Sequence, residues 1–341
     1  MRRRLLGGSL LAALYAPVTA AAALPAVVQS PAPATSLGPG AVLLAAARAG
    51  RRLVVAGERG IVLTSDDQGR RWAQARVPAQ VSLTALGFTD ERNGWACGHF
   101  GVLLRTADAG STWTLALDGV RAAQLTLQAA GDATRRQAAQ RLVDEGPDKP
   151  LFDVAVGRDH LYAVGAYGLA LEARSSAALQ SFSQRLPNPR QLHLHGVCVA
   201  GERVFIVGEQ GLLLRSSDRG ETFESLASPY KGSFFGVLAS ASGSVLAYGL
   251  RGNIFRSGDA GNTWGQVGTP VPVSISAAIQ RSDGSIVLVA QNGDLLLSRD
   301  DGKTFQRRPA LAPFPAAALA EAEGEWLVVA GLRGVQRQAL A

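Results

Sequence analysis

Cysteine and histidine are scarce in this chain, with two and four residues respectively among 341. So few cysteines exclude the disulfide framework that stabilises small secreted domains. His193 and His195 alternate on one predicted strand and could begin a metal site, but no third ligand is evident in the sequence around them, which favours a structural role. The chain also has no phosphate-binding glycine loop, zinc motif or Ser/His/Asp arrangement. We therefore expect neither a metal nor a cofactor.

Runs of five or more basic residues are also absent, although the formal net charge is +7. A modest basic excess without such a run does not indicate a nucleic-acid partner. After the first residues, no apolar stretch is long enough for a transmembrane helix. The length and the 47% apolar fraction suit a protein with a large core.

Residues 1–23 have the pattern of a signal peptide. Arg2–Arg4 form a positive start, Leu5–Ala16 is an apolar segment too short to span a bilayer, and Ala20–Ala23 offers small-residue cleavage sites. Cleavage would lower the net charge from +7 to +4, because this segment carries three arginines and no other charge. An uncleaved membrane anchor is the alternative. We expect an exported protein that consists of residues 24–341.

A glycine turn of the form G-x-x-G recurs seven times, with alanine at its first position once. Successive turns are separated by 41, 67, 43, 41, 41 and 41 residues, so a single step breaks the period. A fixed period of this length is typical of a β-propeller, whose blades contain four short strands each. The first positions are Gly57, Gly98, Gly165, Gly208, Gly249, Ala290 and Gly331.

A second signature, S/T-x-D-x-G-x-x-W/F, follows five of these turns. Its Asp can accept hydrogen bonds from backbone N–H groups of a tight turn, and its aromatic ring is expected to pack between blades, which removes about 150–250 Å² from water. We assign these residues a structural role: Asp67, Asp108, Asp218, Asp259 and Asp300, with Trp72, Trp113, Phe223, Trp264 and Phe305.

The spacing predicts an all-β fold, a seven-bladed β-propeller. The signature with Asp resembles the Asp-box, or BNR, repeat of sialidases and of several non-enzymatic propellers. The complete unit, best seen in Gly249–Trp264, resembles that of the photosystem II stability/assembly factor family over about residues 41–341. This resemblance implies a propeller that assists the assembly or stability of a membrane complex.

Two segments depart from the regular repeat. The last unit contains three strands rather than four, so we predict that Ala26–Ser30 supplies the missing outer strand of blade seven, and that its removal would destabilise the ring. Residues 118–150 form an insertion between blades two and three. It contains a predicted helix over Ala133–Glu145, with Asp132 as its N-cap and Gly146 at its end. Its role is either a surface decoration or a partner contact.

Connections of an antiparallel meander alternate between two faces, which places the insertion and all glycine turns on one face and the Asp boxes on the other. The third residues of the glycine turns then form a ring on the glycine-turn face. We expect partner contacts from its arginines and aromatics, residue types that are enriched at binding hot spots, although exposed turn tips are often charged for no functional reason. These candidates are Arg59, Arg251, Arg333, Phe100 and Tyr167.

The sequence favours a non-enzymatic, exported and monomeric scaffold for a membrane protein or membrane complex, either an assembly client or a transporter. The expected location is the periplasm, or the thylakoid lumen in a photosynthetic host. The alternative is a glycan-directed propeller, a lectin-like binder or a sialidase-type glycoside hydrolase. No tyrosine has a convincing local partner for sialidase chemistry, but two carboxylates from different blades could still meet in space.

Overall fold

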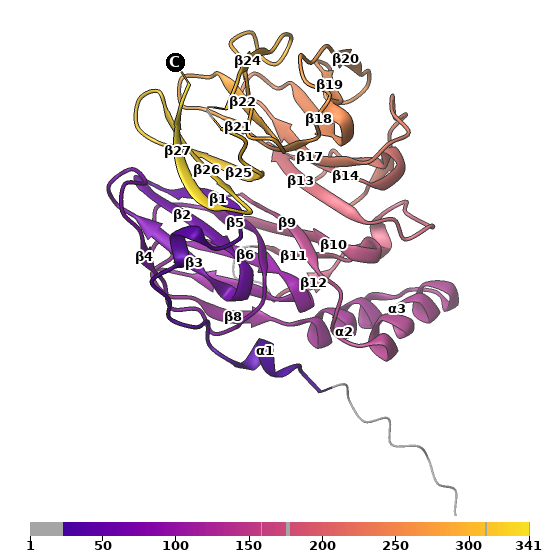
Figure 1. Cartoon of the computed structure of the whole chain (residues 1–341). Coiled ribbons are helices and arrows are strands. Elements are labelled where there is room, and N and C mark those ends of the chain that lie inside the picture. Colours follow the sequence, from indigo (N-terminus) through magenta and orange to yellow (C-terminus); the bar gives the residue numbers. More distant parts are fainter. Residues whose placement is uncertain (1–22, 158, 175–177, 311, 341) are drawn as a thin grey trace, which may run out of the picture.

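The computed structural model describes residues 23–340 except 158, 175–177 and 311, so the predicted signal peptide lies outside the described residues but for its last position. Seven antiparallel sheets, six of four strands and one of three, surround a common axis (Figure 1). The predicted all-β, seven-bladed propeller is therefore confirmed. Among the described residues, no helix has both the length and the apolar character needed to cross a membrane.

The innermost strands of neighbouring blades contact one another all the way around the axis. They are β1 (Leu43–Ala49), β5 (Leu83–Phe88), β9 (Leu151–Val156), β13 (Leu194–Ala200), β17 (Phe234–Ala239), β21 (Ile275–Gln280) and β25 (Ala316–Glu321). The second strands are β2 (Arg52–Gly57), β6 (Gly94–Gly98), β10 (His160–Gly165), β14 (Arg203–Gly208), β18 (Val245–Gly249), β22 (Ile286–Ala290) and β26 (Trp326–Gly331).

The outer half of each blade is shorter. The third strands are β3 (Val62–Ser65), β7 (Leu103–Thr106), β11 (Ala170–Arg174), β15 (Leu213–Ser216), β19 (Ile254–Ser257), β23 (Leu295–Ser298) and β27 (Gly334–Ala339). The fourth strands are β4 (Ala73–Gln74), β8 (Thr114–Leu117), β12 (Gln180–Ser181), β16 (Glu224–Ser225), β20 (Gly265–Val267) and β24 (Gln306–Arg308). Within the described residues, blade seven has no fourth strand.

The two glycines of each glycine turn serve different purposes, as blade one illustrates. Gly57 is extended, with φ −170°, and a Cβ there would lie 1.9 Å from the carbonyl oxygen of Val42. Gly57 is therefore required for close backbone approach rather than for a positive φ. Gly60 does have a positive φ of 72°, and a Cβ on it would lie 2.0 Å from the oxygen of Ala79 in the connection to blade two. The second glycine thus fixes the distance between blades.

Each Asp box is a closed hydrogen-bonded turn. In blade five the Ser257 hydroxyl donates to Asp259 and accepts from the amide of Gly261, while both the amide and the hydroxyl of Thr263 donate to the same carboxylate. The bonds from Thr263 lower the pKa of Asp259 to about 2. The indole Nε1–H of Trp264 donates to the Gly261 carbonyl at 3.0 Å, which fixes the ring.

Seven apolar clusters occupy the junctions between blades, one at each junction. The aromatic ring of every Asp box lies at the junction with the preceding blade. Blades three and seven have no Asp box, so the junctions between blades two and three and between six and seven have no such ring. The rings are Trp72, Trp113, Phe223, Trp264 and Phe305.

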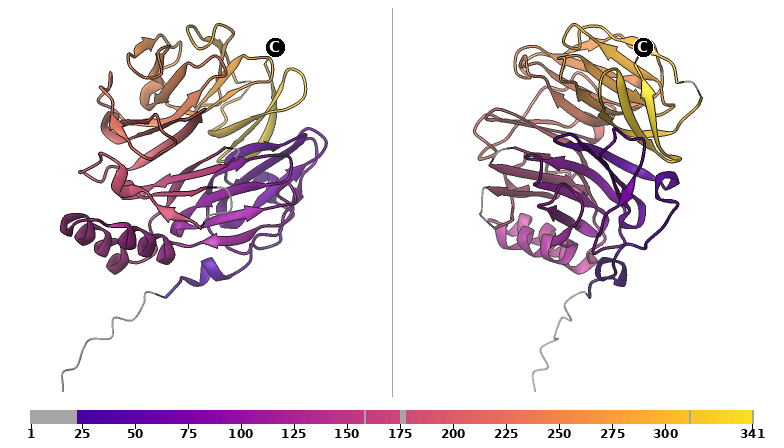
Figure 2. Two further views of the ribbon diagram at one scale, coloured as in Figure 1. Left: turned by 180° about the vertical axis from the view of Figure 1, so that it is seen from behind. Right: turned by 90° about the vertical axis from the view of Figure 1, so that its left-hand side faces the viewer.

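The insertion forms two helices, α2 (Gly119–Ala129) and α3 (Ala133–Glu145). The bounds of α3 are those expected from the sequence, and the Asp132 side chain accepts from the Arg135 amide at 2.8 Å. The sequence interpretation did not identify α2, whose Ala122 and Leu125 pack in the junction between blades two and three. The two helices lie side by side and project from one edge of the ring (Figures 1 and 2).

The predicted closing strand is wrong. Ala26–Ser30 adds no strand to blade seven; Ala26–Gln29 is instead the short helix α1. Its segment lies along blade one, where the Gln80 amide donates to the Val27 carbonyl and Val28 is buried with residues of blades one and two. The physical reason is a Pro-rich flank, since prolines at positions 25 and 31 lack the N–H that a strand needs. Contact with blade seven comes from the 3-10 turn η1 (Gly38–Gly40), which packs on β27.

Val28 offers a test of this placement. We expect Val28→Asp to lower the free energy of unfolding by about 2–4 kcal/mol, because Val28 is 1% exposed in the apolar junction. The matched change Val27→Asp, at a 36% exposed neighbour, is expected to stay within about 0.5 kcal/mol of wild type. Urea unfolding followed by tryptophan fluorescence measures both. Equal effects of the two changes would contradict the placement.

The Asp boxes predict a specific acid sensitivity. A carboxyl group whose folded-state pKa is lowered contributes stability at neutral pH, and this contribution is lost as the pH falls from its ordinary value of 3.8 toward about 2. We expect Asp259→Asn to reduce stability at pH 7 and to reduce the further loss between about pH 4 and pH 2. Acid titration with Trp264 fluorescence tests this. As a control, Asp144→Asn changes an exposed carboxylate on α3. The prediction would be refuted if Asp259→Asn lost stability with falling pH in the same way as wild type.

Candidate functional site

The glycine turns present their third residues from a backbone in the left-handed region. Five of these residues have φ between 51° and 58°, although none is glycine. The last glycine of the turn has a positive φ in all seven blades, but in blades six and seven the third residue does not, so Asn292 and Arg333 are presented by turns of another shape. The five left-handed residues are Arg59, Phe100, Tyr167, Gln210 and Arg251.

The three candidate arginines are exposed and free of protein partners. Arg59, Arg251 and Arg333 form no ion pair and no side-chain hydrogen bond with any described residue. Two arginines that precede Asp boxes behave differently: Arg215 pairs with Glu224 at 2.8 Å, and Arg256 pairs with Asp301 at 2.6 Å. Unlike Arg215 and Arg256, the three candidate arginines of the glycine-turn face remain available to an external anion.

The two candidate aromatics do not act together. Phe100 is half-buried against the junction between blades one and two. Tyr167 is 48% exposed, and its ring meets the edge of His193 at a centroid distance of 4.7 Å, with the Lys149 ammonium 5.8 Å from its centroid. Tyr167 is therefore the more exposed of the two candidate aromatics and can contact a partner.

Next to Tyr167 lies a row of aromatic side chains at the start of the innermost strands of three blades. We call Phe152, His193, His195 and Phe235 the axial aromatic row. Phe152 lies 6.0 Å from His193 and 5.7 Å from His195, and His195 lies 6.0 Å from Phe235, all between ring centroids. All four are only half-buried. The row joins blades three, four and five at the glycine-turn end of the axis.

Sequence reasoning missed Phe152 and Phe235, because no motif surrounds them. They can be recognised only by their shared position in the innermost strand of each repeat. Each innermost strand has a register shift after its first residue. The residue at that shift has an aromatic ring in blades three to five and none in the other four. In repeat order these residues are Leu44, Thr84, Phe152, His195, Phe235, Ser276 and Ala317. Alignment of the innermost strands would have revealed the column.

Hydrogen bonds fix the two histidines. His193 Nδ1 accepts the amide N–H of Tyr167 at 2.9 Å, which leaves the proton of the neutral ring on Nε2. His195 Nδ1 lies 2.8 Å from the carbonyl oxygen of Phe234 and must donate to it, which leaves Nε2 as an acceptor. The described residues contain no cluster of three or more metal-binding side chains, so the arrangement offers stacking surfaces and hydrogen bonds.

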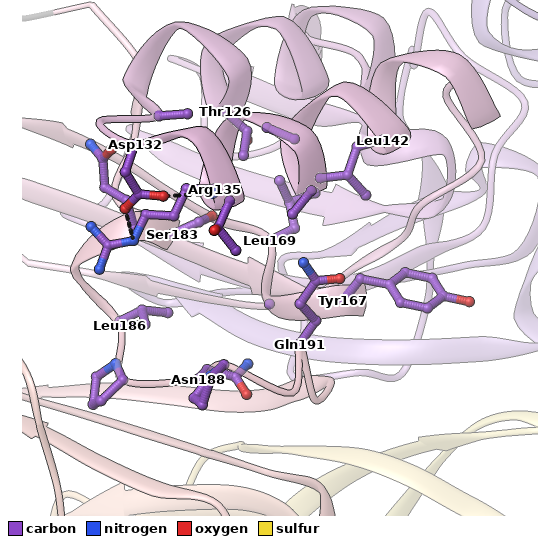
Figure 3. Close-up of a pocket in the computed structure, with 18 residues that line it drawn as sticks. Thr126, Asp132, Arg135, Leu142, Tyr167, Leu169, Ser183, Leu186, Asn188 and Gln191 are labelled. Atoms are coloured by element: carbon purple, nitrogen blue, oxygen red, sulfur yellow. Dashed lines mark hydrogen bonds and ion pairs between the residues drawn. The ribbon is translucent and has the colours of Figure 1, made fainter.

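A pocket of about 480 Å³ lies next to Tyr167, between the insertion and blade three. Helix α3 contributes Ala138 and Leu142, and the connection from blade three to blade four contributes Leu186 and Gln191 (Figure 3). Its lining contains a single carboxylate, Asp132, which is 3.4 Å from the Arg135 guanidinium. Glycoside hydrolysis by the usual route needs two carboxylates across the bond, which this pocket does not provide.

A family model described as photosynthesis system II assembly factor YCF48 matches residues 134–294, just under half of the chain. The resemblance expected from the repeat is confirmed. Among solved structures, the chain is similar to YCF48 bound to D1 peptide, at 16% identity over 89% of this chain and 94% of that chain, with a TM-score of 0.64. No curated protein sequence matches the chain.

Two further structures define the limits of this likeness. YCF48 from Cyanidioschyzon merolae is 14% identical over 91% of this chain and 98% of that chain, with a TM-score of 0.64. A streptogramin B lyase is 11% identical over 88% and 93% of the two chains, with a TM-score of 0.69. Because an enzyme matches as well as YCF48 does, these structures establish the fold alone.

The bond between Tyr167 and His193 can be tested by hydrogen exchange. In His193→Phe the Tyr167 amide loses its acceptor, and we expect its exchange to accelerate about fivefold, which corresponds to about 1 kcal/mol. The matched control is the Arg251 amide, which donates to Ser274 Oγ in the equivalent turn of blade five and should keep its rate. Unchanged exchange at Tyr167 would show that the turn is held without this bond.

Proposed function

We propose that this protein is an exported, non-enzymatic scaffold that binds a membrane protein or membrane complex and assists its assembly or stability. The observation that carries the proposal is the glycine-turn face, where three exposed arginines, unpaired among the described residues, accompany an exposed tyrosine and the axial aromatic row. The similar propeller YCF48, bound to a D1 peptide, supports a protein segment as the ligand.

The chemistry of the face favours an extended client segment with a carboxylate. Guanidinium groups bind carboxylates through two parallel hydrogen bonds, and Arg59, Arg251 and Arg333 have no acid among the described residues that would compete. Aromatic side chains near the axis can cover apolar parts of the same segment. The protein would act as a monomer, without cofactor and without nucleic acid, in the periplasm, or in the thylakoid lumen of a photosynthetic host.

The test is capture of a client from detergent-solubilised host membranes on residues 24–341. We expect wild type to retain one membrane protein, and the variant Arg59→Glu/Arg251→Glu/Arg333→Glu to lose it, because each change replaces attraction by repulsion. A charge-matched control, Arg70→Glu/Arg299→Glu/Lys303→Glu, alters exposed residues of the Asp-box turns and should retain the client. Loss in both variants would indicate an effect of net charge alone.

Failure to retain any membrane protein at low salt would contradict the scaffold proposal. Glycan-binding and hydrolase assays would then follow. If wild type and the arginine variant both retain the membrane protein, the scaffold proposal stands, but these three arginines are not the residues that contact the client.

A further inference from the structure

The pocket beside the insertion has an apolar floor and hydrogen-bonding groups around it. Leu169 and Leu186 are 3% and 7% exposed and line the pocket from blade three and its connection to blade four. The amides of Gln184 and Gln191 and the hydroxyl of Thr134 also line it. None of these three side chains forms a hydrogen bond with another described residue. A cavity of this size falls in the range that accepts a ligand.

Helix α3 borders the pocket and contributes little to the apolar cores between the blades. Of its 13 residues only Ala139 is buried, whereas Leu142 is half-buried and points to the pocket from above (Figure 3). Helix α2 already packs in the junction between blades. The blades therefore do not need α3 for their core: this helix packs beside α2 and borders the pocket with Ala138 and Leu142.

We infer that this pocket anchors an apolar side chain of the extended client segment, a conclusion that rests on the proposed scaffold function. Its charge argues for a neutral occupant, because Asp132 and Arg135 neutralise each other. Its unpaired amides suit a peptide backbone, which offers alternating donors and acceptors. Its position argues for continuity with the face, because Tyr167 both lines the pocket and contacts His193 of the axial aromatic row.

The occupant that fits is thus an extended peptide with an aliphatic or aromatic residue in the pocket. From there the peptide crosses Tyr167 toward the axis, and an acidic group reaches the arginines. In this arrangement the insertion supplies affinity and selects the sequence of the client, while the arginines bind its charge.

The experiment uses a displayed library of short random peptides, selected on immobilised residues 24–341. Individual recovered peptides are then titrated by fluorescence polarisation against wild type, Leu142→Asp and Val143→Asp. Leu142 lines the pocket, whereas its neighbour Val143 on the same helix does not. Thermal unfolding of both variants verifies that they fold.

We expect recovered peptides to share an apolar residue, and their dissociation constants to rise at least about tenfold with Leu142→Asp but to change by less than about twofold with Val143→Asp. Equal responses of the two variants, or no enrichment of peptides over the bare support, would overturn the inference. Selection of small apolar molecules but not peptides in a parallel screen would also overturn it. Membrane capture with the arginine variant is a separate measurement. It can therefore refute the scaffold proposal while the peptide titrations support the pocket, or the titrations can refute the pocket while membrane capture supports the scaffold.

Discussion

The junction between blades seven and one determines whether the ring exists, because the two ends of the repeat meet there without sharing a strand. Side-chain packing closes this junction: Leu53 and Val55 of blade one meet Val328 and Ala330 of blade seven, all at most 1% exposed. Arg48 of blade one also pairs with Glu321 of blade seven at 3.4 Å. The turn η1 adds contact with β27, where a Cβ on Gly334 would lie 2.0 Å from the Pro39 oxygen. Closure therefore depends on apolar burial and on close backbone approach at glycine.

The junctions also explain why the insertion has two helices with different roles. Where an Asp box is present, its aromatic ring fills the outer part of the junction with the preceding blade. Blade three has lost that ring, and α2 brings Ala122 and Leu125 to the same junction. The third strand of blade three also carries the buried Glu172, paired with Arg185 at 2.8 Å, where blades two, four and five carry an arginine. With α2 occupied in this way, α3 is the part of the insertion left for a ligand.

Periodic features of this fold could be predicted from sequence, and features that depend on one particular contact could not. The period and the Asp boxes indicate seven blades because every unit repeats the same turn chemistry, and α3 was predicted because Asp132 and Gly146 mark its ends. The position of Ala26–Gln29 depends on contacts with residues about 50 positions later, and two flanking prolines decide against a strand. The axial aromatic row combines side chains from separate blades, and the pocket combines side chains of the insertion and of blade three. No local sequence motif indicates either combination.

Backbone strain does not identify the functional face of this propeller, although strained residues often mark functional sites. Non-glycine residues with positive φ occur in the glycine turns, but they also occur in the Asp-box turns, where Gln68, Ala109 and Arg219 have φ of 62°, 57° and 57°. The strain is thus a property of the repeat on both faces. The acids of the Asp boxes are satisfied by their own turns. Unpaired cations occur at both faces, because Arg70 and Lys303 at the Asp-box turns form no ion pair with a described residue either. What distinguishes the glycine-turn face is that its unpaired arginines accompany the exposed Tyr167 and the axial aromatic row.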